Sequence, residues 1–220
     1  TTGLPRFDSI QTPMQEEDVS KLKPGVVTGE DYRTLIDSCK EGGYALAAVN
    51  ATSTHTVNAV MEAAAVNRAD VIIQFSNSGA AFFAGKGMAD GDLAKVLGGV
   101  SAARHVHLLA EHYGICVALH TDHANRKLIP WVEGLLDEGE KYFEAHGKPL
   151  FSSHMLDLSA DDIEFNLSES ARILERIAKL DMSLEIELGV TGGEEDGIGS
   201  DFDDTADNSR LYTQPDDVNL

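Results

Sequence analysis

The segment from His120 to His123 reads HTDH and places two imidazoles and one carboxylate within four residues. It follows the apolar run from Ile115 to Leu119, which is typical of a buried strand. A neutral imidazole is a common Zn²⁺ ligand, and the neighbouring carboxylate of Asp122 could orient an imidazole or transfer a proton. The segment therefore indicates a metal or proton-transfer site, and two hydrogen-bonded histidines at a strand end are an equally good interpretation.

A pair of carboxylates occurs in the segment from Leu184 to Leu188, which reads LEIEL. In a strand, Glu185 and Glu187 lie on the same side because successive side chains alternate between the two faces. Two carboxylates in an otherwise apolar strand are costly to bury unless a cation or a donor neutralises them. We expect a divalent metal there, with a Lys or Arg partner as the alternative.

Two adjacent glutamates lie between glycines in the segment GGEEDG, from Gly192 to Gly197. Flexible glycines would let a carboxylate move into a site and act as a general base. Taken alone, the segment is better explained as a solvated acidic turn. Its place after the LEIEL strand, in a long stretch rich in Gly and acidic residues, favours a functional loop.

Polar residues also follow two other apolar runs. SSHMLDLS contains Ser152, Ser153, His154 and Asp157, which we expect together at a strand end, with Asp157 as an oxygen ligand for a metal. QFSNSGA offers Ser76 as a hydrogen-bonding group in a turn of small residues, which a substrate could approach closely. A plain turn from a strand to a loop is the alternative.

These segments lie at the ends of predicted strands that alternate with predicted helices. Five strand-length runs occur, and most are continuously apolar, as expected for parallel strands that are covered on both faces or fill a barrel. In each run the polar residues gather near the carboxyl end, where α/β proteins assemble their sites. The predicted strands cover residues 44–50, 70–76, 115–123, 148–159 and 183–190, and the predicted helices cover 29–39, 54–68, 91–114, 127–147 and 170–182.

Length and charge restrict the class of protein. The 220 residues, of which 42% are hydrophobic, predict one domain over residues 25–220 after a polar leader over 1–24. A formal net charge of −20 disfavours binding to nucleic acids and to anionic membranes. Neither the leader nor a later segment has the length of apolar sequence that spans a bilayer, and only Cys39 and Cys116 occur, so we expect a cytoplasmic protein without disulfides.

The motifs together resemble those of the class IIA, zinc-dependent fructose-bisphosphate aldolases. The resemblance extends over nearly the whole chain from about Gly25 to Leu220 and includes LYTQPDDV. It implies an α/β fold, the TIM (β/α)8 barrel, of which this chain would form about the first five βα units. The segments that carry it are AAVNATST, QFSNSGAAFFAGKG, LHTDHA, PLFSSHMLDLS and LEIELGVTGGEEDG, in this order.

The resemblance implies an activity and a role for each site residue. The activity is metal-dependent cleavage of fructose 1,6-bisphosphate to dihydroxyacetone phosphate and glyceraldehyde 3-phosphate, and the reverse condensation, in glycolysis and gluconeogenesis. It further implies a catalytic Zn²⁺, a second divalent metal ion, a monovalent cation and a homodimer when full length. The implied roles are catalysis for Asp122 and Glu195, with Glu194 the less favoured base, substrate binding for Ser76 and Asn50, and metal ligation for His123, Asp157 and Glu187.

Parts of the family pattern have no counterpart in this chain. Family members carry two further zinc histidines, a Gly-Gly-Ser phosphate loop and a phosphate-binding arginine in a C-terminal part. We therefore expect little or no aldolase activity from the 220 residues alone. The alternatives are a related aldolase acting on tagatose bisphosphate, and a non-catalytic, metal-binding half-barrel that pairs with a partner.

Overall fold

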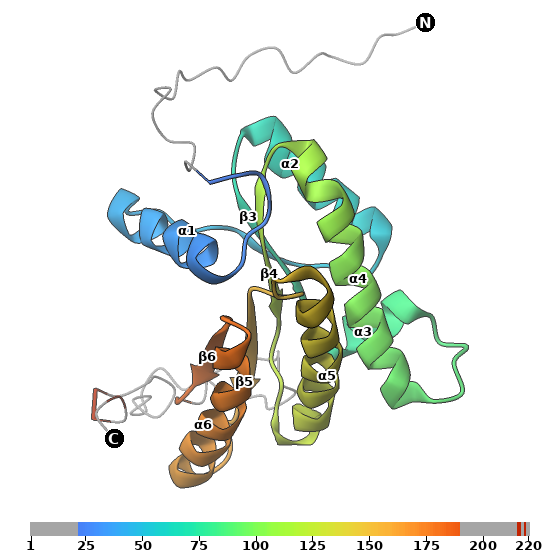
Figure 1. Cartoon of the computed structure of the whole chain (residues 1–220). Helices are drawn as coiled ribbons and strands as arrows, with labels where there is room; N and C mark the ends of the chain where they lie inside the picture. Colours follow the sequence, from blue (N-terminus) through green and yellow to red (C-terminus); the bar gives the residue numbers. More distant parts are fainter. Residues whose placement is uncertain (1–21, 190–214, 217, 219–220) are drawn as a thin grey trace, which may run out of the picture.

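The computed structural model describes residues 22–189, 215–216 and 218, and its helices and strands alternate along the chain (Figure 1). The helices, which include one short 3₁₀ helix η1, pack around strands that all pair in parallel. The strands are β1 (Gly25–Val26), β2 (Ala48–Asn50), β3 (Val71–Phe75), β4 (Cys116–Thr121), β5 (Ser153–Asp157) and β6 (Ser183–Glu187). The helices are α1 (Gly29–Gly42), α2 (Thr54–Asn67), α3 (Asn77–Ala84), α4 (Gly91–Tyr113), η1 (Arg126–Leu128), α5 (Ile129–His146) and α6 (Ile163–Lys179).

Two parallel sheets form one curved wall. The first has the order β1-β4-β3-β2, and the second pairs β5 with β6. Backbone hydrogen bonds join the two sheets, because the Ser152 N–H donates to the Leu119 carbonyl at 2.9 Å and the Asp157 N–H donates to the Ala124 carbonyl at 3.0 Å. A parallel wall with helices connecting its strands confirms the expected partial TIM barrel.

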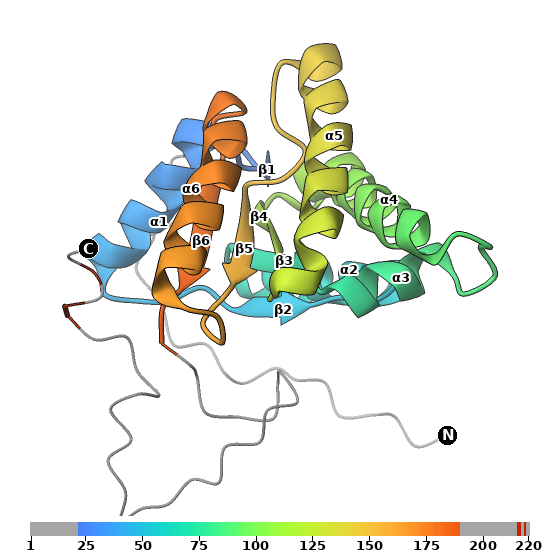
Figure 2. The same cartoon turned by 90° about the horizontal axis from the view of Figure 1, so that it is seen from below.

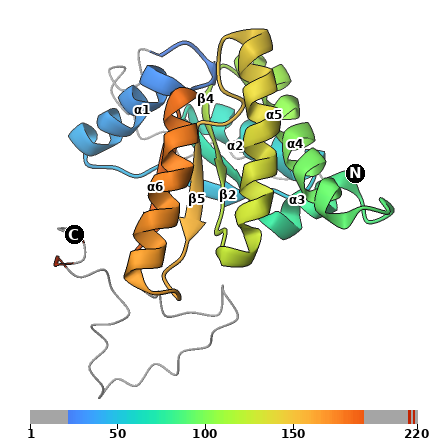
Figure 3. The ribbon, with the colours of Figure 1, turned by 60° about the horizontal axis from the view of Figure 1, so that its bottom comes forward.

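The two faces of the wall have different cores. The larger core lies between the strands and the outer helices and includes Phe75, Leu119 and Leu156, which are fully buried. On the other face, Leu35 of α1 packs against Ala118 of β4. Figure 2 shows α1 apart from α2 to α5, and Figure 3 shows α5 and α6 on either side of β5. Helix α1 therefore covers the inner face at the amino ends of the strands.

The structure contains elements and bounds that the sequence did not predict. The two-residue strand β1 is too short to give an apolar run, and it forms by pairing Gly25 with Cys116. The turn predicted after β3 is the helix α3, which begins after the capping residue Ser76. Helix α6 begins at Ile163, seven residues before the predicted start, because the Asp162 side chain caps the Phe165 N–H at 2.9 Å.

Helix α4 runs without interruption through the adjacent glycines Gly98 and Gly99. Gly98 is required by a crossing with α3, because a Cβ atom there would lie 1.8 Å from the Ala80 carbonyl oxygen, whereas a Cβ atom on Gly99 would lie 2.9 Å from Leu135 Cδ2 of α5. Close approach of two backbones is a common reason for glycine inside a helix. Among the helices that the structure describes, none combines the length and the apolar composition needed to cross a membrane.

Candidate metal centre

Polar side chains from four strands meet at the carboxyl-end rim of the wall, as the positions of the strand ends predicted. Asn50, Asp157 and Glu187 are the last residues of β2, β5 and β6, and Asp122 and His123 directly follow β4. The β5–β6 register pairs Asp157 with Glu187, so both carboxylates lie at the same level of the wall. Parallel pairing therefore brings together residues that are as much as 137 positions apart.

The backbone changes partner at His123. The Asp122 N–H donates to the Phe75 carbonyl of β3 at 3.1 Å, and the Ala124 carbonyl accepts from the Asp157 N–H of β5 at 3.0 Å. Between these two bonds, His123 has a φ of 22°, in the left-handed region that non-glycine residues rarely adopt. Backbone strain of this kind, which costs about 1–3 kcal/mol, is concentrated at functional sites. The bend turns the side chains of Asp122 and His123 toward the same rim, as expected for HTDH.

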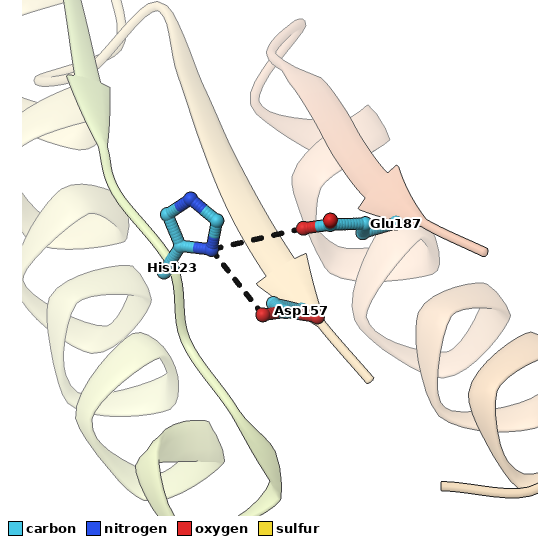
Figure 4. A group of neighbouring side chains, drawn as sticks. All are labelled: His123, Asp157 and Glu187. Carbon is cyan, nitrogen blue, oxygen red and sulfur yellow. Dashed lines mark hydrogen bonds and ion pairs between the residues drawn. The ribbon is translucent and has the colours of Figure 1, made fainter. Parts of the chain in front are cut away.

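Three ligand-type side chains form the core of the site (Figure 4). His123 Nδ1 lies 3.2 Å from Asp157 Oδ2 and 3.7 Å from Glu187 Oε2. One ligand atom from each residue lies within 4.8 Å of the other two. The side chains are 28%, 6% and 15% exposed, respectively, so the two carboxylates are largely removed from water. The predicted metal residues are therefore neighbours in the structure.

Two residues that the sequence did not indicate, Ser159 and Asn166, hold the strand ends that carry these carboxylates. Asp157 Oδ1 accepts from the Ser159 hydroxyl at 2.6 Å and from the Ser159 N–H at 3.2 Å, which leaves Oδ2 facing His123. The Asn166 amide donates to the Glu187 carbonyl at 2.7 Å. The Asp-x-Ser spacing is a turn pattern that could have been recognised, whereas the Asn166 contact depends on how α6 packs.

Asp122 lies beside the metal-type cluster and is held by Asn50. The Asn50 amide donates to Asp122 Oδ2 at 2.8 Å, and Asp122 Oδ1 lies 3.8 Å from His123 Nε2. A carboxylate fixed between an amide and an imidazole has one orientation, which a proton-transfer group requires. The structure thus joins the predicted catalytic residue Asp122 to the predicted substrate residue Asn50 in one hydrogen bond.

Ser76 has a structural role that the sequence did not reveal. Its hydroxyl accepts from the Gly79 N–H at 3.1 Å and caps α3, and it lies 3.3 Å from the Ser78 hydroxyl. Helix α3 therefore begins at the rim, and its first N–H groups point toward the carboxyl end of β3. A helix start with a serine hydroxyl is a suitable anion-binding arrangement, although Ser76 is not part of the cluster around His123.

The polar residues of SSHMLDLS do not gather at the strand end, so that part of the prediction is wrong. Only Asp157 reaches the rim, because Ser152, Ser153 and His154 precede it by three to five residues in an extended strand. These three side chains are buried and bond to β4 instead. Glu185 also lies below the rim, where its Oε2 is 3.4 Å from His120 Nε2. Glu195 and Glu194 lie outside the described residues.

Burial keeps the inner histidines neutral. Desolvation lowers the pKa of His120, although the nearby Glu185 carboxylate acts in the opposite direction. Desolvation and the neighbouring His120 lower the pKa of His154 to about 3. Neutral imidazoles below the rim add no positive charge to the site.

The side chains present fit a divalent metal ion. An imidazole with two carboxylates is a donor set that Zn²⁺ and other divalent transition metals accept. Two carboxylates that are largely buried and face one imidazole are stabilised by a cation, which would offset both their desolvation and their mutual repulsion. Within residues 22–189, this is the cluster of three ligand-type side chains that meets the spacing of a metal site.

Known proteins are similar to this chain over most of its length. The chain is 54% identical to fructose-bisphosphate aldolase class 2 of Escherichia coli strain K12 over 200 residues, and 50% identical to fructose-bisphosphate aldolase of Borreliella burgdorferi over 204 residues. The matches cover 90% and 91% of this chain. A crystal structure of fructose-bisphosphate aldolase from Campylobacter jejuni superposes with a TM-score of 0.78 at 50% identity, covering 90% of this chain and 53% of the other.

The chain spans about half the length of these relatives, 55% for both sequences. A second solved structure, the YdjI aldolase of Escherichia coli K12, has a TM-score of 0.54 at 21% identity and supports the fold alone. The family described as fructose-bisphosphate aldolase class-II matches residues 30–220, which include each strand of the rim. The chain belongs to the class-II fructose-bisphosphate aldolase family.

Proposed function

We propose that the chain supplies the metal-binding and proton-transfer side of an aldolase that cleaves fructose 1,6-bisphosphate to dihydroxyacetone phosphate and glyceraldehyde 3-phosphate. The single observation that carries this proposal is the cluster of His123, Asp157 and Glu187, with Asp122 beside it. The relatives that match the chain over 90% of its length are named for this activity, and the family is generally metal-dependent. The reverse condensation uses the same groups.

Metal ligation is assigned to His123, Asp157 and Glu187. We assign His123 to a catalytic Zn²⁺ and the two carboxylates to a second divalent ion, because an imidazole suits zinc and carboxylate oxygens suit harder cations. A bound metal would act as a Lewis acid that stabilises the negative charge developing on the substrate ketone oxygen. A monovalent cation remains part of the proposal through the family resemblance.

Asp122 is assigned as the acid that gives a proton to the aldehyde oxygen during condensation and removes it during cleavage. Its hydrogen bond from Asn50 at 2.8 Å fixes the carboxyl group, and its 16% exposed side chain is open to a substrate. Glu195 is assigned as the base that removes the carbon-bound proton. The support for Glu195 is its place in GGEEDG, a few residues after β6 ends at the rim.

Substrate binding is assigned to Ser76 and Asn50. Ser76 caps α3 at the rim, so a phosphate oxygen near its hydroxyl would also face the first N–H groups of the helix. Asn50 would contact the sugar next to the carboxyl group that it holds. We also propose a homodimer in the cytoplasm, which is supported by the resemblance to this family.

The test measures cleavage of fructose 1,6-bisphosphate before and after chelation, and after Zn²⁺ is restored. It compares this chain with the same sequence extended to the length of its relatives. We expect chelator-sensitive cleavage in the extended protein and little in the 220 residues. Asp122→Asn should lower kcat by about 10²–10⁴-fold, the usual contribution of general acid–base catalysis, without lowering Zn²⁺ affinity to the same extent.

Three results would separate the alternatives. Chelator-resistant cleavage would contradict a metal-dependent mechanism. Equal kcat/KM for tagatose 1,6-bisphosphate and fructose 1,6-bisphosphate would favour the related ketose-bisphosphate aldolase. Zn²⁺ binding without cleavage in the extended protein would favour a metal-binding half-barrel.

A further inference from the structure

Side chains replace part of the backbone ladder between β4 and β5. The two strands share backbone hydrogen bonds only near their ends, at Leu119 and at Ala124, within the described residues. Between these ends, each residue of the segment Ser152–His154 bonds to one residue of β4 through its side chain. The distances are 2.9 Å from the Leu119 nitrogen to Ser152 Oγ, 2.7 Å from His120 Nδ1 to Ser153 Oγ, and 2.8 Å from Thr121 Oγ1 to His154 Nδ1.

Only one of these contacts lies on the inner face below the metal centre. His154 packs its ring against Phe151, with the ring centres 5.0 Å apart, and belongs to the helix-facing side with Thr121. His120 and Ser153 point to the other side, because side chains alternate along a strand and His120 shares its face with Asp122. The bond between His120 and Ser153 is therefore the one that bears on the rim above it.

His120 also reaches across β5 to β6. Its Nε2 lies 3.4 Å from Glu185 Oε2, while its Nδ1 bonds to Ser153. A carboxylate only accepts hydrogen bonds, so the proton of a neutral imidazole belongs on Nε2, and Nδ1 accepts from the Ser153 hydroxyl. Burial supports this neutral form because it lowers the pKa of His120. One side chain thus connects three adjacent strands.

Each of the three strands carries one residue of the candidate metal centre. His120 of β4 precedes His123, which follows that strand, by three residues; Ser153 precedes Asp157 on β5 by four, and Glu185 precedes Glu187 on β6 by two. His120 is 6% exposed and Ser153 is 3% exposed, so water cannot substitute freely for their bond. Their separation consequently sets how the strand ends meet at the rim.

We propose that His120 is a positioning residue of the metal centre, which holds the strands of His123, Asp157 and Glu187 at the spacing a metal requires through Ser153 and Glu185. This inference rests on the proposed metal-binding function. His120 does not touch the metal in this proposal and acts through the strands. Residues that orient metal ligands from the next layer typically change metal affinity by about 10–100-fold when they are replaced.

The test is Co²⁺ binding by the 220-residue chain. Calorimetry measures the affinity, and the visible absorption of the bound ion reports its ligand geometry. Ser153→Ala removes the hydroxyl that bonds to His120. Ser183→Ala is the matched control, because Ser183 pairs with Ser153 across β5 and β6. Among the described residues, no side-chain hydrogen bond is assigned to Ser183. We expect about tenfold weaker Co²⁺ binding and a shifted absorption band for Ser153→Ala, and unchanged values for Ser183→Ala.

A second variant covers the case in which Ser153→Ala does not fold. His120→Asn keeps a polar atom at the level of Nδ1, opposite Ser153, but cannot reach Glu185, so we expect weaker binding there as well. Thermal melting of the metal-free variants, followed by circular dichroism, identifies loss of fold. Wild-type affinity and an unshifted band in the folded variants would overturn the positioning role. Failure of the unmutated chain to bind Co²⁺ would instead overturn the metal site on which the role rests.

Discussion

The crossing of α3 and α4 gives the most direct prediction, because Gly98→Ala adds one methyl group where the structure leaves no space for it. The added Cβ would lie 1.8 Å from the Ala80 carbonyl oxygen and 2.7 Å from its carbon. Ordinary van der Waals contact begins at 3.4 Å, so the two helices would have to separate by about 1.6 Å. A carbonyl in a helix backbone cannot rotate away as a side chain would, and α3 must move as a unit.

The expected loss of stability follows from two opposing effects. Overpacking of a well-packed contact costs about 1–3 kcal/mol, and replacing a helical glycine by alanine gains about 1 kcal/mol of helix propensity. Gly139→Ala is the matched control, since Gly139 is also buried inside a helix, α5, and its added Cβ would meet only Leu180 Cδ1 at 4.0 Å. We expect Gly98→Ala to lower the free energy of unfolding by roughly 1–2 kcal/mol, and Gly139→Ala to raise it by up to about 1 kcal/mol.

Urea unfolding followed by far-UV circular dichroism measures both changes under identical conditions. For a chain of this size, 1 kcal/mol corresponds to about 2–4 °C in Tm, so the two variants should differ by several degrees in opposite directions. Because α3 begins at Ser76, a displaced α3 should also weaken substrate binding more than metal binding. Equal stability of the two alanine variants would refute the reasoning, since helix propensity alone would then account for both.

Three further predictions concern an ion pair, acid stability and the metal centre. Arg176→Ala should lower the free energy of unfolding by about 0.5–1 kcal/mol, an effect that 1 M NaCl reduces, because Arg176 bridges two carboxylates of α5 at a largely solvated surface. Burial lowers the pKa of His107 to about 4, so the unfolded chain binds a proton that the folded chain does not, and stability should fall as the pH drops from about 6.5 toward 4. Urea unfolding at pH 7 and at pH 5 should show that this residue costs about 2 kcal/mol of stability at the lower pH. The variant His107→Gln can still donate to the Leu150 carbonyl and should reduce that loss. His123→Asn removes the imidazole ligand and should weaken Co²⁺ binding, which the carboxylates of Asp157 and Glu187 would then support alone. It should leave the melting temperature of the metal-free protein nearly unchanged, because asparagine tolerates the positive φ at this position.

The rim was predictable from the sequence because it depends on local rules. Parallel strands end at the same edge, and alternation fixes which side chains share a face, so Asp122, Asp157 and Glu187 could be placed together before their distances were known. The bend at His123 was also foreseeable as a requirement, since two adjacent residues of a straight strand cannot face one site. In the structure, the left-handed backbone of His123 makes this bend, between one backbone hydrogen bond to β3 and another to β5.

The contacts that tune the rim were not predictable, because they depend on long-range packing. Strand β1 exists only through its pairing with β4, and its two residues carry no periodic pattern. The sequence predicts Ser152 at a polar strand end, but its hydroxyl donates to the Val27 carbonyl at 2.6 Å and accepts from the Leu119 N–H of β4. Because Val27 directly follows β1 and Ser152 directly precedes β5, these bonds link the three strands in the interior. Consecutive polar residues that begin a strand carry the same composition as those that end one, so only the register of the neighbouring strand distinguishes the two cases.

The packing of the strands also explains how the site tolerates buried carboxylates. The Asp157 and Glu187 side chains are 6% and 15% exposed, and holding two largely buried carboxylates together requires both compensating charge and a backbone that cannot relax apart. Compensating charge is what a metal ion would provide, and the rigid backbone is what the side-chain bonds between β4 and β5 provide. A residue below the rim can therefore change metal affinity without touching the metal, because displacement of a strand end also displaces its ligand atom.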